Sequence, residues 1–263
     1  MLVMSVLSLK GGVGKTTLVL GLAGAALERG LRALVVDLDP QANATTALDP
    51  KDVTFTANDV LADARAGVLK EAVTTSGWGE EVQVIAAEPA LEHRNRSEGK
   101  GSELRLRKAM NGTPAAYDIV LVDTPPSLGE LTKNALAASQ RALVVAEPTL
   151  FALQGAQQAL DAVDVVRRGF NLRLRTIGIV ANRVRPTSEH RFRLNELATA
   201  YGDLVFDPAM LDRTAVMQAQ GACIPVQRWH SRGARAASQV LSTYLDRVLS
   251  TAVGDGPSLM GRR

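Results

Sequence analysis

With 263 residues, of which 46% are hydrophobic, the chain is long enough for one large α/β domain and short for two. The single cysteine excludes an intramolecular disulfide and cannot by itself hold a metal cluster, and an aromatic share of 4% disfavours a surface that stacks single-stranded bases. The net charge is only +3. No apolar run reaches the length of a membrane span and the N-terminus lacks a basic signal-peptide start, so we expect a cytoplasmic protein.

Residues 2–27 follow the order strand, glycine-rich loop, helix. The apolar run 2–7 predicts a buried strand, and the Ala/Leu-rich stretch 18–27 predicts a helix. The loop between them has glycines at positions 11, 12 and 14, which permit a tight turn that aims several backbone N–H groups at one anion. The N-terminal dipole of the following helix adds to this attraction. The segment therefore predicts a cradle for phosphate groups.

Two side chains at the end of the loop complete the phosphate site. Lys15 is positioned to neutralise the β- and γ-phosphates of a nucleotide, and Thr16 to offer a hydroxyl to Mg²⁺. The strict P-loop pattern has a glycine where this chain has Leu9, but the glycines nearest the phosphates and the Lys-Thr pair are intact. The alternative interpretation is a tight strand-to-helix turn with an accidental lysine.

The loop Lys10-Gly11-Gly12-Val13-Gly14-Lys15-Thr16-Thr17 resembles the deviant Walker A motif of the ParA/MinD family of ATPases. The resemblance implies that these eight residues bind the nucleotide. It also implies an ATP-dependent homodimer in which Lys10 reaches across to the phosphates of the partner. Lys10 and Lys15 are accordingly both candidate catalytic residues.

A second buried strand is predicted over 31–36 and ends in Asp37-Leu38-Asp39-Pro40-Gln41. Two carboxylates two residues apart at the end of a strand point the same way, toward the edge where α/β proteins bind ligands. A turn with an aspartate as its cap is the alternative. This stretch also resembles the ParA family, which implies that Asp39 orients the attacking water and that Asp37 supports the metal ion and the loop.

Residues 50–116 are less informative. The pattern indicates a short helix over 58–66, a short strand over 82–86 and a helix over 103–110, with an exposed charged loop over 92–100. No repeat or low-complexity stretch indicates a separate domain here.

The apolar residues 119–122 predict a buried strand that ends at Asp123. Asp123 is suited to hold an Mg²⁺-bound water beside Thr16. An apolar strand ending in aspartate is common, but its position about a hundred residues after the phosphate loop favours a Walker B motif. The following Thr124-Pro125-Pro126-Ser127 again resembles ParA proteins.

The rest of the chain continues the alternation of strands and helices. We expect a strand over 141–147, a helix over 151–168, a strand over 174–181, a short last strand over 203–206 and a final helix over 234–248. The fold class is therefore α/β, a mainly parallel sheet with helices on both faces, of the P-loop NTPase type. We expect a single domain over residues 1–253 and a disordered tail over 254–263.

The resemblance implies an adenine site in the C-terminal half. Asn182, at the end of its strand, would read the edge of the adenine, with a simple turn residue as the alternative. Pro208 and Met210 lie in Asp207-Pro208-Ala209-Met210, which occupies the place of the family's Ile-Pro-Arg-Asn adenine-lining segment. Only the proline matches that segment.

Arginines dominate the charge of the second half. Eight lie between 167 and 193 against one acid, Glu189, which fits either a solvated surface or a face that binds a polyanion. Arg213 and Arg232 lie in stretches that resemble the family's DNA-contacting end. The alternatives are a surface residue at a helix start for Arg213 and a turn cap for Arg232.

The resemblance implies an Mg²⁺-dependent ATPase of the ParA/Soj-like partition type. Its ATP-bound sandwich dimer would bind DNA non-specifically at the nucleoid and partition DNA cargo with a ParB-like stimulating protein. The alternative is a MinD-like or cargo-positioning ATPase on a membrane or protein assembly, although no stable membrane anchor is expected. A non-catalytic scaffold is disfavoured by the intact Lys10, Lys15, Asp39 and Asp123. The chain has no room for a helix-turn-helix before the phosphate loop, so sequence-specific operator binding is not expected.

Overall fold

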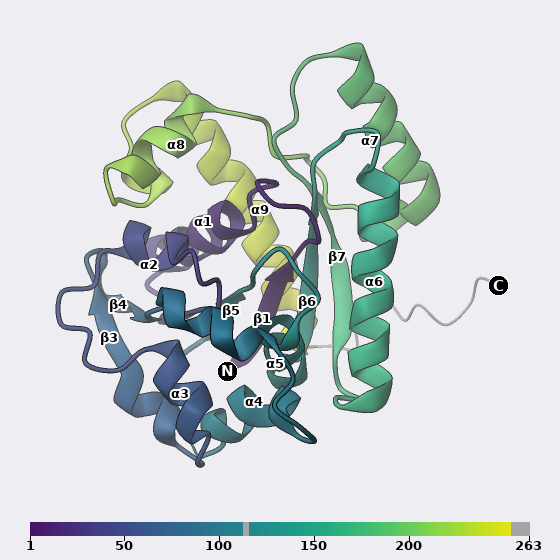
Figure 1. The fold of residues 1–263 in the computed structure, drawn as a ribbon. Coiled ribbons are helices and arrows are strands. Elements are labelled where there is room, and N and C mark those ends of the chain that lie inside the picture. The colour runs from purple at the N-terminus through teal and green to yellow at the C-terminus, as the bar shows by residue number, and fades with distance from the viewer. Residues whose placement is uncertain (113–115, 254–263) are drawn as a thin grey trace.

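The computed structural model describes residues 1–112 and 116–253, and over these ranges seven strands form one sheet (Figure 1). The strand order is β3-β4-β2-β5-β1-β6-β7, and neighbouring strands are parallel except β3 and β4. The strands are β1 (Leu2–Leu7), β2 (Ala33–Asp37), β3 (Val73–Ser76), β4 (Gly79–Ile85), β5 (Ile119–Asp123), β6 (Arg141–Ala146) and β7 (Arg175–Ala181). The expected mainly parallel α/β sheet is confirmed. The tail 254–263, for which we expect disorder, lies outside the described residues.

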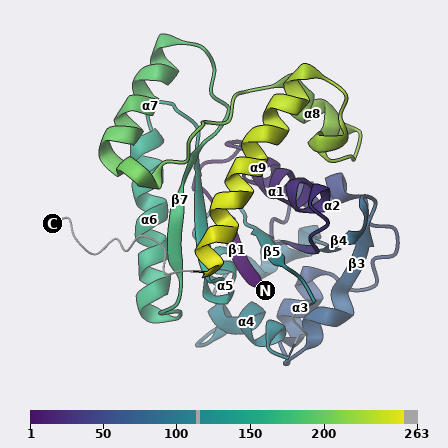
Figure 2. The ribbon, with the colours of Figure 1, turned by 180° about the vertical axis from the view of Figure 1, so that it is seen from behind.

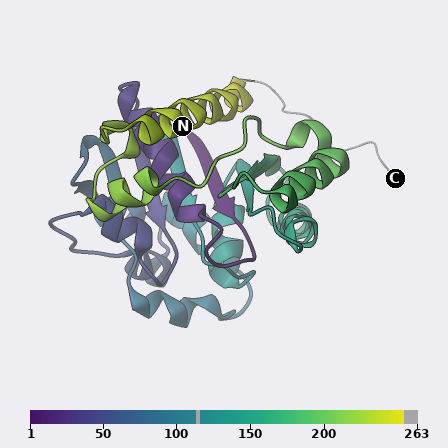
Figure 3. The same ribbon diagram turned by 90° about the horizontal axis from the view of Figure 1, so that it is seen from above.

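Helices connect the strands and cover both faces of the sheet. The α-helices are α1 (Lys15–Glu28), α2 (Asn43–Leu48), α3 (Ala57–Asp63), α4 (Arg105–Met110), α5 (Glu130–Ala138), α6 (Ala152–Gly169), α7 (Ser188–Tyr201), α8 (Thr214–Gly221) and α9 (Arg232–Val253). The 3-10 helices are η1 (Val68–Ala72), η2 (Pro89–Asn95), η3 (Ser102–Leu104), η4 (Gly202–Leu204) and η5 (Val226–Arg228). Helices α1 and α9 lie on one face, and α3, α4 and α5 on the other (Figures 2 and 3). Within the described ranges, no helix is both long and apolar enough to cross a bilayer.

The central strand β1 illustrates why both faces need helices. All its residues are buried. Met4 and Val6 pack into the core shared with α1 and α9, whereas Val3 packs into the core beneath α3, α4 and α5. This division follows from the alternation of side chains along a strand. A continuous apolar run of this kind is typical of a parallel strand covered on both sides.

The two outer strands of the sheet are protected in different ways. β3 is only 4 residues long, and its pairing with β4 shifts register between Thr75 and Ser76. The segment 205–211 runs beside β7 and the residues after it. It makes two parallel bridges, Val205 with Ile179 and Leu211 with Val184, and so covers this edge of the sheet.

The prediction of a strand over 203–206 was wrong. Residues Gly202–Leu204 form a 3-10 turn, and in this stretch Val205 makes a single bridge to Ile179. Phe206 instead turns inward and packs edge-on against Tyr244 with ring centroids 5.2 Å apart. The N–H of Phe206 still donates to the carbonyl of Ile179 at 2.8 Å, and the next contacts near the end of β7 come from Met210 and Leu211. The segment therefore makes separate contacts with β7 in place of a continuous ladder.

Several elements were not predicted from the sequence: the strand β3 and the helices α2, α5, α7 and α8. β3 pairs with β4. α7 begins after Thr187, whose hydroxyl accepts a hydrogen bond from the backbone N–H of His190 at 3.2 Å. The loop expected over 92–100 also begins within η2.

The carboxyl ends of six parallel strands, β1, β2, β4, β5, β6 and β7, meet at one edge of the sheet. Ligands of open α/β sheets bind outside this edge. The motif residues of the sequence follow these strands, so the fold gathers them at one place.

Candidate nucleotide-binding site

The loop after β1 is shaped by glycines in the left-handed region. Gly12 has φ 75° and Gly14, which precedes the first residue of α1, has φ 93°. A Cβ at position 14 would lie 2.2 Å from Nδ2 of Asn182. Position 14 therefore excludes a side chain for two reasons, backbone conformation and space. The loop leads directly into the N-terminus of α1, as a phosphate cradle requires.

Lys15 is the first residue of α1 and is buried, with 6% of its surface exposed. Burial lowers its pKa from the ordinary lysine value, whereas the nearby charges of Asp123 and Asp39 raise it. A lysine placed here, between two carboxylates and the phosphate loop, supplies a point charge to an anion in the cleft.

Thr16 and Asp123 form the second part of the site. The Thr16 hydroxyl donates a hydrogen bond of 2.6 Å to Oδ2 of Asp123, at the end of β5. Asp123 is fully buried, and its Oδ1 has no hydrogen-bond partner within the described chain. Burial, and then the charge of Asp37, raise the pKa of Asp123 to about 8. A buried carboxylate in this state is stabilised by a cation.

These residues fit Mg²⁺. A hydroxyl, one carboxylate, water and nucleotide phosphates are the oxygen donors with which Mg²⁺ is commonly held. Over residues 1–112 and 116–253, no group of three or more His, Cys, Asp or Glu side chains forms a metal site on its own. The ion that fits beside Thr16 and Asp123 is thus one shared with phosphate oxygens.

Asp37 and Asp39 have different surroundings although both follow β2. Oδ1 of Asp37 accepts from the backbone N–H of Asp39 at 3.0 Å, and Oδ2 accepts from the N–H and hydroxyl of Thr45 at 2.9 and 2.8 Å. Burial raises the pKa of Asp37 to about 6, against the hydrogen bonds from Thr45. Asp37 therefore holds the loop that carries Asp39, and its support of the metal ion stays a prediction.

A cleft of about 530 Å³ brings these parts together. It is lined by Gly11, Gly12, Gly14, Lys15, Thr16, Thr17, Leu20, Asp39, Gln41, Asn43, Thr46, Ala47, Pro126 and Gln220. Asp39 thus faces the same space as the phosphate loop.

Lys10 directly precedes Gly11, which lines this cleft. Its side chain is 51% exposed, and its Nζ is 3.5 Å from Oε2 of Glu147, which follows β6. Glu147 was not singled out in the sequence. Its position directly after a strand beside β1 is the signal that could have identified it.

A second pocket, of about 220 Å³, lies beside the phosphate loop. It is lined by Gly12, Gly14, Thr17, Asn182, Arg183, Met210, Leu211, Asp212, Arg213, Val216, Met217 and Gln220. Nδ2 of the buried Asn182 donates to the carbonyl of Val13 at 2.7 Å. Met210 lines this pocket, and the adenine roles of Asn182, Pro208 and Met210 stay predictions. The carbonyl of Pro208 instead accepts from the Tyr244 hydroxyl at 2.6 Å.

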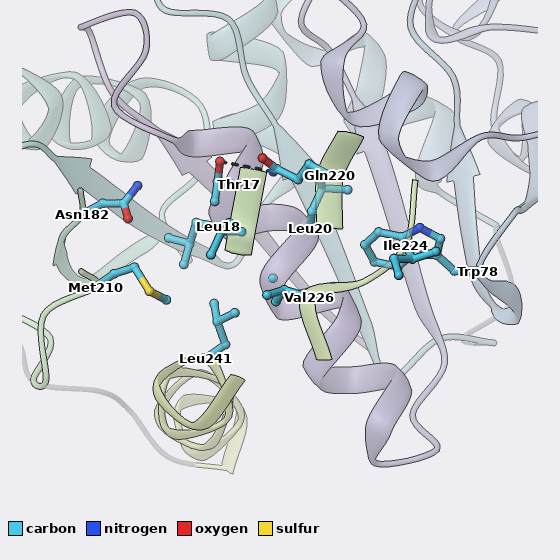
Figure 4. Close-up of a pocket in the computed structure, with 12 residues that line it drawn as sticks. Thr17, Leu18, Leu20, Trp78, Asn182, Met210, Gln220, Ile224, Val226 and Leu241 are labelled. Atoms are coloured by element: carbon cyan, nitrogen blue, oxygen red, sulfur yellow. Dashed lines mark hydrogen bonds between the residues drawn. The ribbon is translucent and has the colours of Figure 1, made fainter. Parts of the chain in front are cut away.

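Thr17 and Gln220 line both the cleft and the second pocket. Nε2 of Gln220 donates to the Thr17 hydroxyl at 3.2 Å (Figure 4). Beneath this pair, Leu18, Met210 and Leu241 form a small apolar pocket between α1 and α9 (Figure 4). Gln220 was missed in the sequence, because its role depends on α8 packing over the start of α1.

Arg213 and Arg232 lie near one another at the starts of α8 and α9. Arg213 precedes α8 and lines the second pocket, and its Cδ is 3.9 Å from the position of a Cβ on Gly233. Arg232 is the first residue of α9. The structure therefore brings one of the two arginines to the rim of the nucleotide site.

Comparison with known proteins identifies relatives of this arrangement. Residues 1–176 match the family model described as an AAA domain. The chromosome partitioning protein ParA of Caulobacter vibrioides is 32% identical over 263 residues, covering 95% of this chain and 97% of that protein. ParA of Myxococcus xanthus is 37% identical over 178 residues, covering 65% of this chain and 61% of that protein. The chain thus matches less than two thirds of the Myxococcus protein.

Solved structures share the fold. Cobyrinic acid a,c-diamide synthase from Mycobacterium smegmatis, with bound ADP and magnesium, is 26% identical, with a TM-score of 0.78 and coverage of 99% of this chain and 100% of that chain. Apo McdA from Cyanothece has a TM-score of 0.80 at 20% identity, covering 97% of this chain and 100% of that chain, which is a likeness of fold alone.

Proposed function

The chain belongs to the ParA/MinD family of P-loop ATPases, and from that premise we propose that it is a ParA/Soj-like partition ATPase. In this proposal its ATP-bound homodimer binds DNA without sequence preference at the nucleoid. A ParB-like partner stimulates hydrolysis, and the cycle positions a DNA cargo. The observation that carries the proposal is the meeting of Lys15, the Thr16–Asp123 pair and Asp39 around one cleft.

Bound Mg²⁺–ATP supplies the phosphoanhydride bond that is cleaved. The N–H groups of the loop and the dipole of α1 hold the phosphates, and Lys15 neutralises their charge. Thr16 and Asp123 would hold the ion. Asp39 orients the water, and its position is fixed because Asp37 and Thr45 tie down the loop that carries it.

Lys10 acts in the dimer. Its side chain is half exposed and adjoins Gly11, which lines the cleft, and its partner Glu147 lies outside the residues that line the cleft. A side chain in that position is available to the phosphates of a facing subunit. Release from the weak contact with Glu147 would accompany that movement.

The arginines of α8 and α9 are the better candidates for contact with DNA. In the cluster over 167–193, several guanidinium groups already pair with acids: Arg167 and Arg168 with Asp164, Arg185 with Asp212, and Arg193 with Glu189 and Glu196. By contrast, the stretch 213–245 contains no acidic residue. Phosphates favour a surface of unneutralised arginines, so we assign DNA binding to Arg213 and Arg232.

The test is DNA binding with ATP, with ADP and without nucleotide over a salt series. We expect binding with ATP that falls steeply with salt and is insensitive to base sequence. Arg232→Ala should weaken binding to all sequences alike and reduce the salt slope by about one, and the matched Arg173→Ala should not. Two results would overturn the DNA assignment: DNA binding of equal strength with and without nucleotide, or no DNA binding by the ATP-bound dimer. Either result would favour positioning on a membrane or protein assembly.

A further inference from the structure

Arg183 has an unusual backbone conformation beside the phosphate loop. It follows Asn182 at the end of β7 and has φ 57°, in the left-handed region that a non-glycine residue seldom adopts. Its Nη1 donates to the carbonyl of Gly12 at 2.7 Å. The same side chain lines the second pocket. An arginine is thus held in a strained turn with its guanidinium on the nucleotide loop.

The turn at Arg183 is fixed from both sides. The N–H of Asn182 donates to the carbonyl of Ala146 at 2.8 Å, and the N–H of Val184 donates to the carbonyl of Met210 at 3.0 Å. The neighbouring residues are therefore bound to other parts of the sheet edge. A conformation of this kind is strained and persists only where the surroundings determine it, often at a functional site.

Asn182 and Arg183 together hold two consecutive carbonyls. Nδ2 of Asn182 binds the carbonyl of Val13 at 2.7 Å, and Nη1 of Arg183 binds that of Gly12 at 2.7 Å. These are the carbonyls of the segment in which Gly12 and Gly14 have positive φ. Glycines lose the most conformational freedom on ordering, so a free loop of this composition would bind phosphate at a large entropic cost.

We propose that Arg183 is a positioning residue for the nucleotide. It fixes the Gly12 peptide before the nucleotide arrives, so that the loop N–H groups already face the phosphates. A charged donor makes this hydrogen bond stronger than a neutral one. The conformational entropy of the loop is then lost during folding and not when the nucleotide binds, so the affinity for nucleotide is higher. The inference deepens the proposed function and rests on its nucleotide site.

The experiment measures the affinity of labelled Mg²⁺–ADP and Mg²⁺–ATP for three variants. Arg183→Gly removes the guanidinium but accepts φ 57° without strain, so the free protein should unfold at the wild-type temperature or higher. We expect about tenfold weaker affinity for both nucleotides. Arg183→Lys keeps a charged donor and should recover most of the affinity. Arg185→Ala removes an equal charge two residues along and should bind as wild type.

The outcomes separate the inference from the proposed function. Wild-type protein that binds neither nucleotide would overturn the ATPase assignment itself. If the wild type binds nucleotide and Arg183→Gly binds it with equal affinity, the role of Arg183 is overturned and the proposed function is not. A lower unfolding temperature in Arg183→Gly, without rescue of affinity by lysine, would show that the contact is merely structural.

Discussion

Lys10 is held by Glu147 of its own chain, with Nζ 3.5 Å from Oε2. The lysine is half exposed, so the pair contributes only about 0–1 kcal/mol and orients the side chain more than it stabilises the fold. Such a contact is easily exchanged for a stronger one with phosphate. The two lysines of the loop are therefore expected to have separable roles.

Lys15→Ala should lose ATP binding, because Lys15 is the buried charge of the phosphate cradle. Lys10→Ala should bind ATP but stay monomeric in gel filtration. Glu147→Gln is the control, since it removes the tether but keeps Lys10, and it should dimerise with ATP. Normal dimerisation of Lys10→Ala would contradict the role of this lysine across the interface.

Asp39→Ala should trap an ATP-bound dimer. A carboxylate that only orients water contributes little to ground-state binding, so turnover should fall about a hundredfold or more, with affinity changed less than about twofold. The measurement pairs steady-state turnover with equilibrium binding of ATP. Equal losses in both would assign Asp39 to the metal site instead.

Gly14→Ala should destabilise the protein and abolish nucleotide binding. The new Cβ would lie 2.2 Å from Nδ2 of Asn182, at a residue with φ 93°. The backbone strain alone costs about 1–3 kcal/mol. Gly11→Ala is the matched control for folding, because a Cβ there meets nothing within 4 Å. Equal thermal midpoints for the two variants would refute this account of the loop.

Thr45→Val should lower the free energy of unfolding by about 1–3 kcal/mol. The Thr45 hydroxyl donates to the buried carboxylate of Asp37 and accepts from the N–H of Ala87 at 2.8 Å, and valine leaves both without that partner. Thr46→Val, at an exposed neighbour, should change stability by less than about 0.5 kcal/mol. Denaturant unfolding of the two variants provides the comparison, and similar losses would contradict the role of Thr45.

The parts of the site that follow a strand could be predicted from the sequence. Apolar runs locate the strands, and the fold brings residues after them, such as Asp39 and Asp123, to one edge. Glu147, Arg183 and Gln220 could not be predicted in this way. Their contacts join residues 137, 171 and 203 positions apart, so they depend on which strands and helices become neighbours.

The errors in the fold have a similar origin. The stretch 203–206 has the residues of a strand, but it begins within the 3-10 turn Gly202–Leu204 and pairs with β7 through one bridge at Val205. β3 is too short to show a period, and it exists only as a partner of β4. The sequence pattern predicted elements with a clear apolar run or period. It failed where contacts with residues distant in the sequence determine the conformation.

The protected margins of the sheet restrict how two copies can join. An exposed edge strand can pair with a strand of a second chain through backbone hydrogen bonds. Such pairing leads to aggregates as readily as to dimers. Here one margin is a short strand with a register shift, and the other is flanked by the bridges of Val205 and Leu211. Association by sheet extension is thereby disfavoured. The proposed homodimer therefore has to form through surfaces other than the sheet edges, such as the loops at the strand carboxyl ends that line the cleft.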